Sequence, residues 1–237
     1  MQKVSGPFTF RQFQLIHGDG VWKVGTDSIL LGSWCRIESA ARALDMGTGT
    51  GILAMMLAQR NENIHIDAVD ILPEALEVAR TNTLRSKWKQ RIAVIERDLV
   101  TSDPSWSDQY DLVICNPPYY PVGLASSDDT RRASRQGLGF SLWDVPGIAR
   151  GYLRAKGALN VVIPAQSIYH FIERANACGL YVHRRLAVKH NQTVPAAIVL
   201  LELSDSPVKA DNRMLMLYEN MKPTQEYVQL CANFISL

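Results

Sequence analysis

Four consecutive residues, Asn116-Pro117-Pro118-Tyr119, combine groups that can hold and activate an aromatic amine. The two prolines stiffen the backbone and remove two N–H donors, so carbonyl oxygens and the Asn116 amide are left to face a ligand. An exocyclic amine on an aromatic ring is a poor nucleophile because its lone pair is delocalised. If the Asn116 side-chain carbonyl and the Pro117 main-chain carbonyl accept its two N–H bonds, the nitrogen moves toward tetrahedral geometry and its developing positive charge is stabilised.

Tyr119 adds a flat ring beside these carbonyls. The ring can stack on a planar group and hold its amine in line with an electrophilic methyl group, as a base turned out of its stack requires. A purely structural Pro-Pro turn is the alternative. The position of the tetrapeptide, directly after a predicted strand and downstream of a glycine-rich loop, favours the catalytic interpretation.

The glycine-rich loop spans residues 44–51, LDMGTGTG, with glycines at alternate positions. Such glycines let the backbone turn tightly and approach a ligand, and the helix that follows directs free N–H groups at the same point. The GxGxG spacing differs from the GxGxxG fingerprint of a dinucleotide pyrophosphate site. It favours S-adenosylmethionine as ligand, with another nucleotide or a structural glycine turn as the alternatives.

Two carboxylates follow the next two predicted strands. Asp70 stands where it can accept both ribose hydroxyls of an adenosine, a device that nicotinamide enzymes also use. Asp98 stands where it can reach an adenine amino group. Asp70 can alternatively be a favourable charge at the N-terminus of the helix that begins at Pro73. Asp98 can alternatively be an ordinary loop residue. With the glycine loop, these residues indicate an adenosine-containing cofactor.

These motifs are positioned by strand-length segments that alternate with helix-length segments. The predicted strands cover 41–46, 64–69, 92–95, 110–115 and 158–163, and the predicted helices 51–59, 73–84 and 142–153. Such alternation predicts an α/β protein with a doubly wound, mostly parallel sheet. Residues 181–188 and 196–203 add a terminal antiparallel hairpin, which makes seven strands. A short strand near Met214 and a helix over 224–234 finish the chain.

Two basic segments offer contacts for phosphates. The quarter 121–200 holds 10 Lys or Arg and 4 Asp or Glu, whereas the whole chain has a net charge of +2. It includes most of a loop over 120–141 that is long for a compact domain and therefore typical of a functional or disordered segment. The second basic run covers 85–91, where Trp88 either stacks on a base or packs under the helix end. A plain solvated face is the alternative for both segments.

Composition excludes several other classes of protein. With 237 residues, 47% hydrophobic and 20% charged, the chain is predicted to fold as one globular domain, neither disordered nor fibrous. No apolar run reaches the length of a membrane span or a signal peptide. The four widely spaced cysteines suggest reduced thiols in a cytoplasmic protein. The five histidines form no ligand cluster, so no metal is expected, and no obligate protein partner is evident.

Several motifs together resemble a known family. In order and separation, LDMGTGTGIL, VDI, RDL and NPPY are similar to Class I S-adenosylmethionine-dependent N-methyltransferases that act on amino groups of adenine, guanine or glutamine. FTFRQF at 8–13, KVGTDSILLG at 23–32 and NPPYY at 116–120 narrow the resemblance to the tRNA1(Val) adenine-37 N6-methyltransferase family. The resemblance implies a Rossmann-like methyltransferase fold, S-adenosyl-L-methionine as cofactor, and methylation of N6 of adenine 37 in the anticodon loop of a tRNA.

The family pattern also implies residue roles. Catalytic roles fall on Asn116, Pro117, Pro118 and Tyr119. Cofactor contacts fall on Lys23, Thr26, Asp45, Gly47, Thr48, Gly49, Gly51, Asp70, Ile71, Asp98, Leu99 and Asn116. The RNA contacts, matched only loosely, are Tyr120, Arg131, Arg132 and Arg135. A helix cap is the alternative for Thr26 or Asp27. Residues 1–40 form an extension that contributes to the cofactor pocket, and residues 41–237 form the methyltransferase domain.

Other functions fit part of the pattern. An enzyme of this kind can instead methylate a release-factor glutamine, an rRNA guanine or a DNA adenine. Glutamine enzymes resemble chains with a helical N-terminal substrate domain, but only about 40 residues precede the glycine loop here. A DNA enzyme usually carries a separate target-recognition region, for which the chain leaves little room. A non-catalytic RNA-binding protein needs no Asn116–Tyr119 geometry, so the intact tetrapeptide argues against it.

Overall fold

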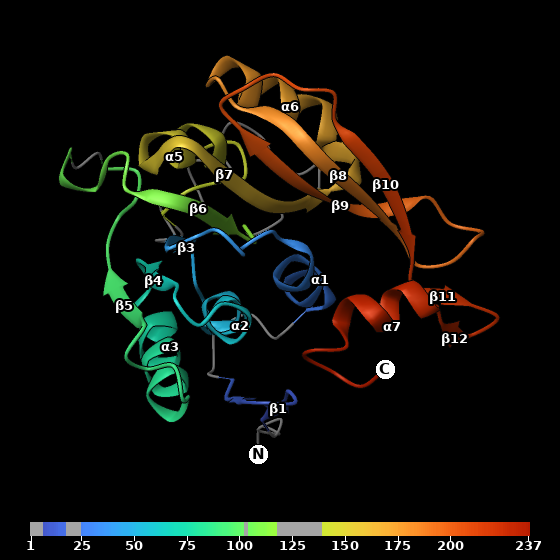
Figure 1. The fold of residues 1–237 in the computed structure, drawn as a ribbon, viewed down its shortest axis with the longest axis horizontal. Coiled ribbons are helices and arrows are strands. Elements are labelled where there is room, and N and C mark those ends of the chain that lie inside the picture. The colour runs from blue at the N-terminus through green and yellow to red at the C-terminus, as the bar shows by residue number, and fades with distance from the viewer. Residues whose placement is uncertain (1–6, 18–24, 102–103, 118–138) are drawn as a thin grey trace.

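The computed structural model describes residues 7–17, 25–101, 104–117 and 139–237. Within them, eight strands form one sheet in the order β10-β8-β9-β7-β6-β3-β4-β5 (Figure 1). These strands are β3 (Arg42–Met46), β4 (His65–Asp70), β5 (Ile92–Glu96), β6 (Tyr110–Cys115), β7 (Leu153–Pro164), β8 (Tyr181–Lys189), β9 (Ala196–Ser204) and β10 (Asp211–Met216). Two short antiparallel ribbons join β1 (Phe8–Thr9) to β2 (Gln14–Leu15) and β11 (Tyr218–Glu219) to β12 (Lys222–Pro223).

The pairing of the strands confirms the predicted fold class. Strand β3 pairs in parallel with β4 on one side and with β6 on the other, and β5 and β7 extend these parallel pairs. The predicted terminal hairpin is β8 and β9, and β9 is antiparallel to both β8 and β7. The short strand predicted near Met214 joins the same sheet as β10, parallel to β8, so the described sheet has eight strands rather than seven.

Helices cover both faces of the sheet. They are α1 (Thr26–Trp34), α2 (Ile52–Arg60), α3 (Pro73–Arg85), α5 (Val145–Tyr152), α6 (Ile168–Ala177) and α7 (Gln225–Cys231). Figure 1 shows α1, α2, α3 and α7 on one side and α5 and α6 on the other. Strand β6 alternates between the two cores: Leu112 and Ile114 face α1 and α2, while Val113 and Cys115 face α5 and α6.

Two helices and one strand boundary differ from the sequence prediction. The sequence analysis considered a helix cap at Thr26 or Asp27 but assigned no range to helix α1, because almost all sides of the helix are buried and leave no amphipathic period to detect. Helix α6 was also missed, although Ile168, Phe171 and Ala175 lie at helical spacing and are buried. Strand β7 begins at Leu153, five residues earlier than predicted, because exposed charged residues hide the strand pattern there. Among the described helices, none combines the length and apolar character needed to cross a bilayer.

Candidate functional site

The candidate residues gather at one edge of the sheet. The chain runs from β3 outward to β4 and β5, and then returns to β6 on the other side of β3. Ligands of open α/β sheets bind at such a reversal of strand order, beyond the carboxyl ends of the strands. The segments that leave β3, β4 and β6 here carry the glycine loop, Asp70 and Asn116. The fold therefore brings together motifs that are about 70 residues apart in the sequence.

The glycine loop is held against the end of β4. The backbone N–H groups of Gly47 and Thr48 both donate to the carbonyl oxygen of Val69, each at 2.9 Å. Gly49 has a φ of +54°, in the left-handed region that favours glycine, and a Cβ added to it would meet no atom within 4 Å. The space beside Gly49 is therefore open to a ligand that approaches the backbone.

Asp70 organises the backbone around it. Its Oδ2 accepts the Gly49 N–H at 2.9 Å, and its Oδ1 accepts the N–H groups of Ile71 and Leu72 at 2.9 and 3.1 Å. Asp70 therefore also has the alternative role predicted for it, a negative charge close to the N-terminus of the helix that begins at Pro73. A carboxylate has about four acceptor positions, so capacity remains for a ligand hydroxyl.

Asp45 is a fully buried carboxylate at the start of the glycine loop. Its Oδ2 accepts hydrogen bonds from the Thr48 hydroxyl at 2.6 Å and the Ala54 N–H at 3.1 Å, whereas its Oδ1 has no partner among the described residues. Burial raises the pKa of Asp45 to about 7, with a smaller upward contribution from the Asp70 charge and opposite contributions from the two donors. A buried oxygen of this kind fits a cationic hydrogen-bond donor.

The Asp98 loop adjoins the same edge. The N–H of Arg97 donates to the carbonyl oxygen of Asp70 at 3.0 Å, so the loop after β5 lies beside the end of β4. Asp98 itself is exposed, and its Oδ1 accepts the Val100 N–H at 2.9 Å. Leu99 is buried. Asp98 therefore has the alternative role predicted for it, that of an ordinary loop residue, and its loop lies next to Asp70.

Asn116 lies beside helix α1. Its Nδ2 donates a hydrogen bond to the hydroxyl of Ser28 at 2.8 Å, and the following Pro117 is buried. Ser28 was missed from the sequence, where the available signal was a small polar residue next to the buried run of residues 29–31. Seven predicted site residues lie outside the described residues: Lys23, Pro118, Tyr119, Tyr120, Arg131, Arg132 and Arg135.

The first turn of α1 carries two predicted polar residues, Thr26 and Asp27. The N-cap position is Gly25, so neither Thr26 nor Asp27 is the N-cap residue, although the Asp27 carboxylate accepts its own backbone N–H in the first turn. Thr26 is exposed, whereas Asp27 is half-buried and burial raises its pKa.

Residues 139–140 also close on the site and were not predicted to contribute. A Cβ on Gly47 would lie 3.2 Å from the Phe140 ring, and a Cβ on Gly139 would lie 3.2 Å from the Ile71 side chain. Ile71 itself is half-buried. Phe140 belongs to no sequence motif. The signal that could have identified it is its position at the end of the long loop predicted over 120–141.

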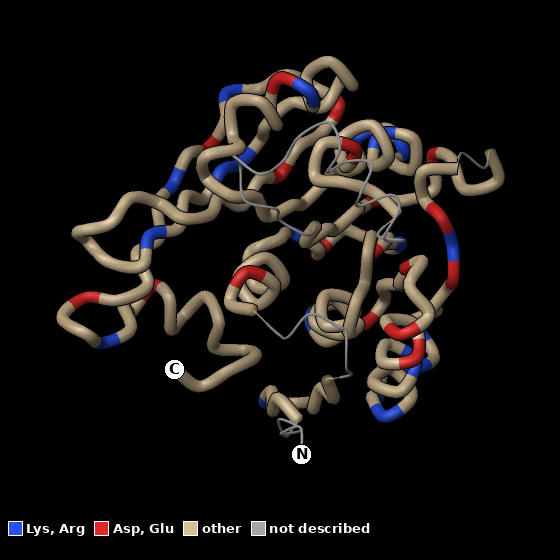
Figure 2. Tube along the Cα trace, turned by 180° about the vertical axis from the view of Figure 1, so that it is seen from behind, with Lys and Arg blue, Asp and Glu red and all other residues tan. Residues whose placement is uncertain are grey.

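The described part of the basic quarter 121–200 is largely engaged within the fold. Figure 2 shows Lys and Arg interspersed with Asp and Glu rather than gathered in one patch. Arg184 pairs with Glu202, Arg154 with Asp111, and Arg174 with the carbonyl oxygen of Trp143. These arginines therefore stabilise the fold and are poor candidates for phosphate contacts.

The basic run 85–91 divides into two groups. Trp88 is 6% exposed and packs edge-on against Phe13, so the alternative of a base-stacking ring is wrong. Arg91 donates to the carbonyl oxygens of Ala58, Asn61 and Ile64 and is structural. Arg85 and Lys87 are exposed instead.

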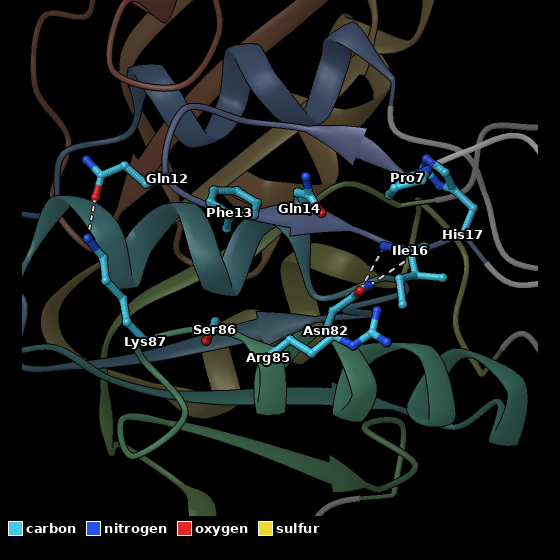
Figure 3. Close-up of a pocket in the computed structure, with 10 residues that line it drawn as sticks. All are labelled: Pro7, Gln12, Phe13, Gln14, Ile16, His17, Asn82, Arg85, Ser86 and Lys87. Atoms are coloured by element: carbon cyan, nitrogen blue, oxygen red, sulfur yellow. Dashed lines mark hydrogen bonds between the residues drawn. The ribbon is translucent and has the colours of Figure 1, made fainter.

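Arg85 and Lys87 line a groove of about 590 Å³ between the β1–β2 ribbon and the end of α3 (Figure 3). At one end, Lys87 donates to the Gln12 side chain at 2.7 Å. At the other end, Asn82 bonds both the N–H and the carbonyl oxygen of Ile16, and it also reaches the carbonyl oxygen of Thr50 in the glycine loop. None of the ten lining residues is acidic, so the groove favours an anionic ligand.

The sheet order, the glycine loop at the reversal point and the carboxylates beyond the next strands define a Rossmann-like methyltransferase domain. Residues 21–177 match the family model described as "Methyltransferase small domain". A tRNA1(Val) (adenine(37)-N6)-methyltransferase of Pectobacterium carotovorum is 37% identical over 96% of this chain and 92% of its own length. A protein of the same name from Tolumonas auensis is 37% identical over 96% and 95%. The chain belongs to this family of tRNA1(Val) (adenine(37)-N6)-methyltransferases.

Solved structures support the fold alone. A predicted O-methyltransferase from Agrobacterium tumefaciens has a TM-score of 0.69 at 21% identity, with 88% of this chain and 96% of that chain covered. TYW2 of Pyrococcus horikoshii, solved in complex with MeSAdo, has a TM-score of 0.61 at 10% identity, with 86% and 73% covered. The shared architecture therefore extends across proteins with very different sequences.

Proposed function

We propose that this protein transfers a methyl group from S-adenosyl-L-methionine to N6 of adenine 37 in the anticodon loop of tRNA1(Val). The observation that carries the proposal is the position of Asn116. It follows β6 directly, beside the strand that leads into the glycine loop, in a chain 37% identical to proteins of that name over 96% of its length. Cytoplasmic location and tRNA as the macromolecular partner belong to the same proposal.

The residues at the sheet edge fit this cofactor. When bound, S-adenosyl-L-methionine supplies an activated methyl group. Asp70 retains acceptor capacity for ribose hydroxyls, and the buried Oδ1 of Asp45 is suited to the cationic amino group. Open space beside Gly49 admits a ligand close to the backbone. Ile71, Asp98 and Leu99 would surround the adenine, and Lys23 and Thr26 of the N-terminal extension would approach the methionine end.

The chain's own contribution to the reaction is to make the target amine nucleophilic. The Asn116 side-chain carbonyl and the Pro117 main-chain carbonyl accept the two N–H bonds of the adenine amino group. These oxygens stabilise the positive charge that the nitrogen acquires as it gains the methyl group, and one amine proton then leaves to solvent. Pro118 would add a second residue without an N–H donor, and the Tyr119 ring would stack on the base.

Methyl transfer from labelled S-adenosyl-L-methionine to unmodified bulk tRNA tests the proposed function. After nuclease digestion, the expected product is labelled N6-methyladenosine from a single tRNA species. A tRNA1(Val) transcript with guanine at position 37 serves as the control and should take up no label. Label in rRNA, in DNA or in a release factor, with none in tRNA, would overturn the substrate assignment.

The groove of Arg85 and Lys87 provides a prediction about tRNA binding. Removing both charges, by Arg85→Gln with Lys87→Gln, should raise KM for tRNA and reduce the slope of log affinity against log salt by about two, one unit for each lost phosphate contact. The control is Lys209→Gln with Lys222→Gln, which removes two exposed charges from other elements. Equal salt slopes for the two double variants would show that the groove does not contact phosphates.

A further inference from the structure

We infer that Ser28 is a positioning residue for methyl transfer. Its hydroxyl anchors the Asn116 side-chain amide through Nδ2, and this contact leaves the carbonyl oxygen available to the substrate amine. The inference rests on the proposed function and makes helix α1, in the N-terminal extension, part of the catalytic arrangement.

The orientation of the Asn116 amide decides whether the residue can work. The two ends of an asparagine amide are nearly the same in shape, but Oδ1 accepts hydrogen bonds whereas Nδ2 donates them. A half-turn about the last side-chain torsion would present N–H groups to an amine that itself must donate. That torsion has broad, roughly two-fold preferences, so the backbone of Asn116 does not select the correct orientation. A neighbouring hydrogen-bonding group is therefore required to hold this torsion.

Ser28 supplies this group. The Nδ2 to Oγ distance of 2.8 Å lies well within the range of N–H···O hydrogen bonds. Ser28 is 7% exposed, so bulk water has little access to replace the hydroxyl. The contact also follows from the sheet pattern, because Ile114, two residues before Asn116, faces the same α1 side of the sheet.

Helix α1 is a rigid support for the hydroxyl. Residues 29–31, which follow Ser28, are buried in the core shared with α2. Further along the helix, Gly32 packs so closely on Met56 that an added Cβ would lie 2.7 Å from the methionine sulfur. A hydroxyl on such a support keeps its place when the site is empty, and the Asn116 amide is consequently oriented before the substrate arrives.

The test compares Ser28→Ala with Ser33→Ala in the full-length chain. Ser33 lies on the same helix, where its hydroxyl contacts the Cys231 sulfur at 3.9 Å. Ser28→Ala should lower kcat about 5- to 20-fold, as expected for one lost hydrogen bond, with KM for tRNA and Kd for S-adenosyl-L-methionine within twofold of wild type. Ser33→Ala should leave all three constants within twofold.

Two further readouts separate positioning from a general structural role. In the Asn116→Ala background, Ser28→Ala should cause no additional loss of kcat, because the group that it orients is gone. In protein labelled with 15N-asparagine, the Asn116 side-chain amide protons should exchange faster with water in Ser28→Ala than in wild type or Ser33→Ala.

Either of two results would overturn the inference alone: wild-type kcat for Ser28→Ala, or the same loss of kcat in both backgrounds. Wild-type turnover by Asn116→Ala would overturn the proposed mechanism together with it.

Discussion

Replacing Asn116 by alanine should lower kcat about 100- to 1,000-fold and leave the affinity for S-adenosyl-L-methionine within about twofold of wild type. The magnitude is that of removing one preorganised polar group that stabilises charge in a transition state. We expect kcat and the cofactor affinity to respond differently because the Asn116 side chain donates to Ser28 of α1, whereas the glycine loop is held by Val69 and Asp70. Single-turnover kinetics and calorimetry measure the two quantities separately.

Graded variants sharpen this prediction. Asn116→Asp keeps a carbonyl-type acceptor but loses the NH2 donor that meets Ser28, and should fall between wild type and Asn116→Ala. The thermal midpoint of each variant controls for folding, since a half-buried residue at a strand end contributes to packing. If Asn116→Ala weakens cofactor binding and kcat to the same extent, the residue acts through the cofactor pocket and the amine-activation mechanism is wrong.

Local sequence patterns predicted the central part of the fold. The segments that became β3, β4 and β6 are short apolar runs, α2 directly follows the glycine loop, and α3 has a Pro near its start. Helix α1 is buried on almost every side, as α2 is, but it has no polar face and no glycine loop before it to mark its start. Strand β10 was predicted as a short isolated element, and its parallel pairing with β8 depends on long-range contacts that no local pattern encodes.

The candidate site was predictable where residue type alone limits the chemistry. Gly49, Asp70 and Asn116 were proposed as site residues because a left-handed backbone, a ribose acceptor and an amine acceptor each require particular residue types at strand ends. Ser28 and Phe140 were not, since serine and phenylalanine fill many roles and only the packing of α1 and of residues 139–140 reveals theirs. Trp88 illustrates the opposite error, because an aromatic residue within a basic run suggested RNA stacking but is buried against Phe13.

The second large effect is a pH dependence of cofactor binding through Asp45. The pKa of this buried carboxyl is about 7 without ligand, and a cationic amino group binds only the ionised form. Well below pH 7, each unit of pH should therefore weaken the affinity for S-adenosyl-L-methionine about tenfold. Because the carboxyl is half ionised at pH 7, the total loss between pH 7 and pH 5 is about 50-fold. Asp45→Asn should remove this slope and bind weakly at every pH, whereas Asp98→Asn, which removes an exposed carboxylate at the same edge, should retain the slope.

The loss of affinity at low pH should not arise from unfolding caused by Asp45. Its folded pKa is raised above the value near 4 of an unfolded chain, so the folded state holds the proton more tightly. The contribution of Asp45 to stability is therefore greatest below pH 4 and is lost as pH rises to 7. As pH falls from 7 to 5, the wild-type free energy of unfolding should increase relative to that of Asp45→Asn, while the affinity for the cofactor decreases. Calorimetry measures the cofactor affinity and chemical denaturation measures the free energy of unfolding at the same pH values. If both decrease together as pH falls, Asp45 is not the group whose titration weakens binding.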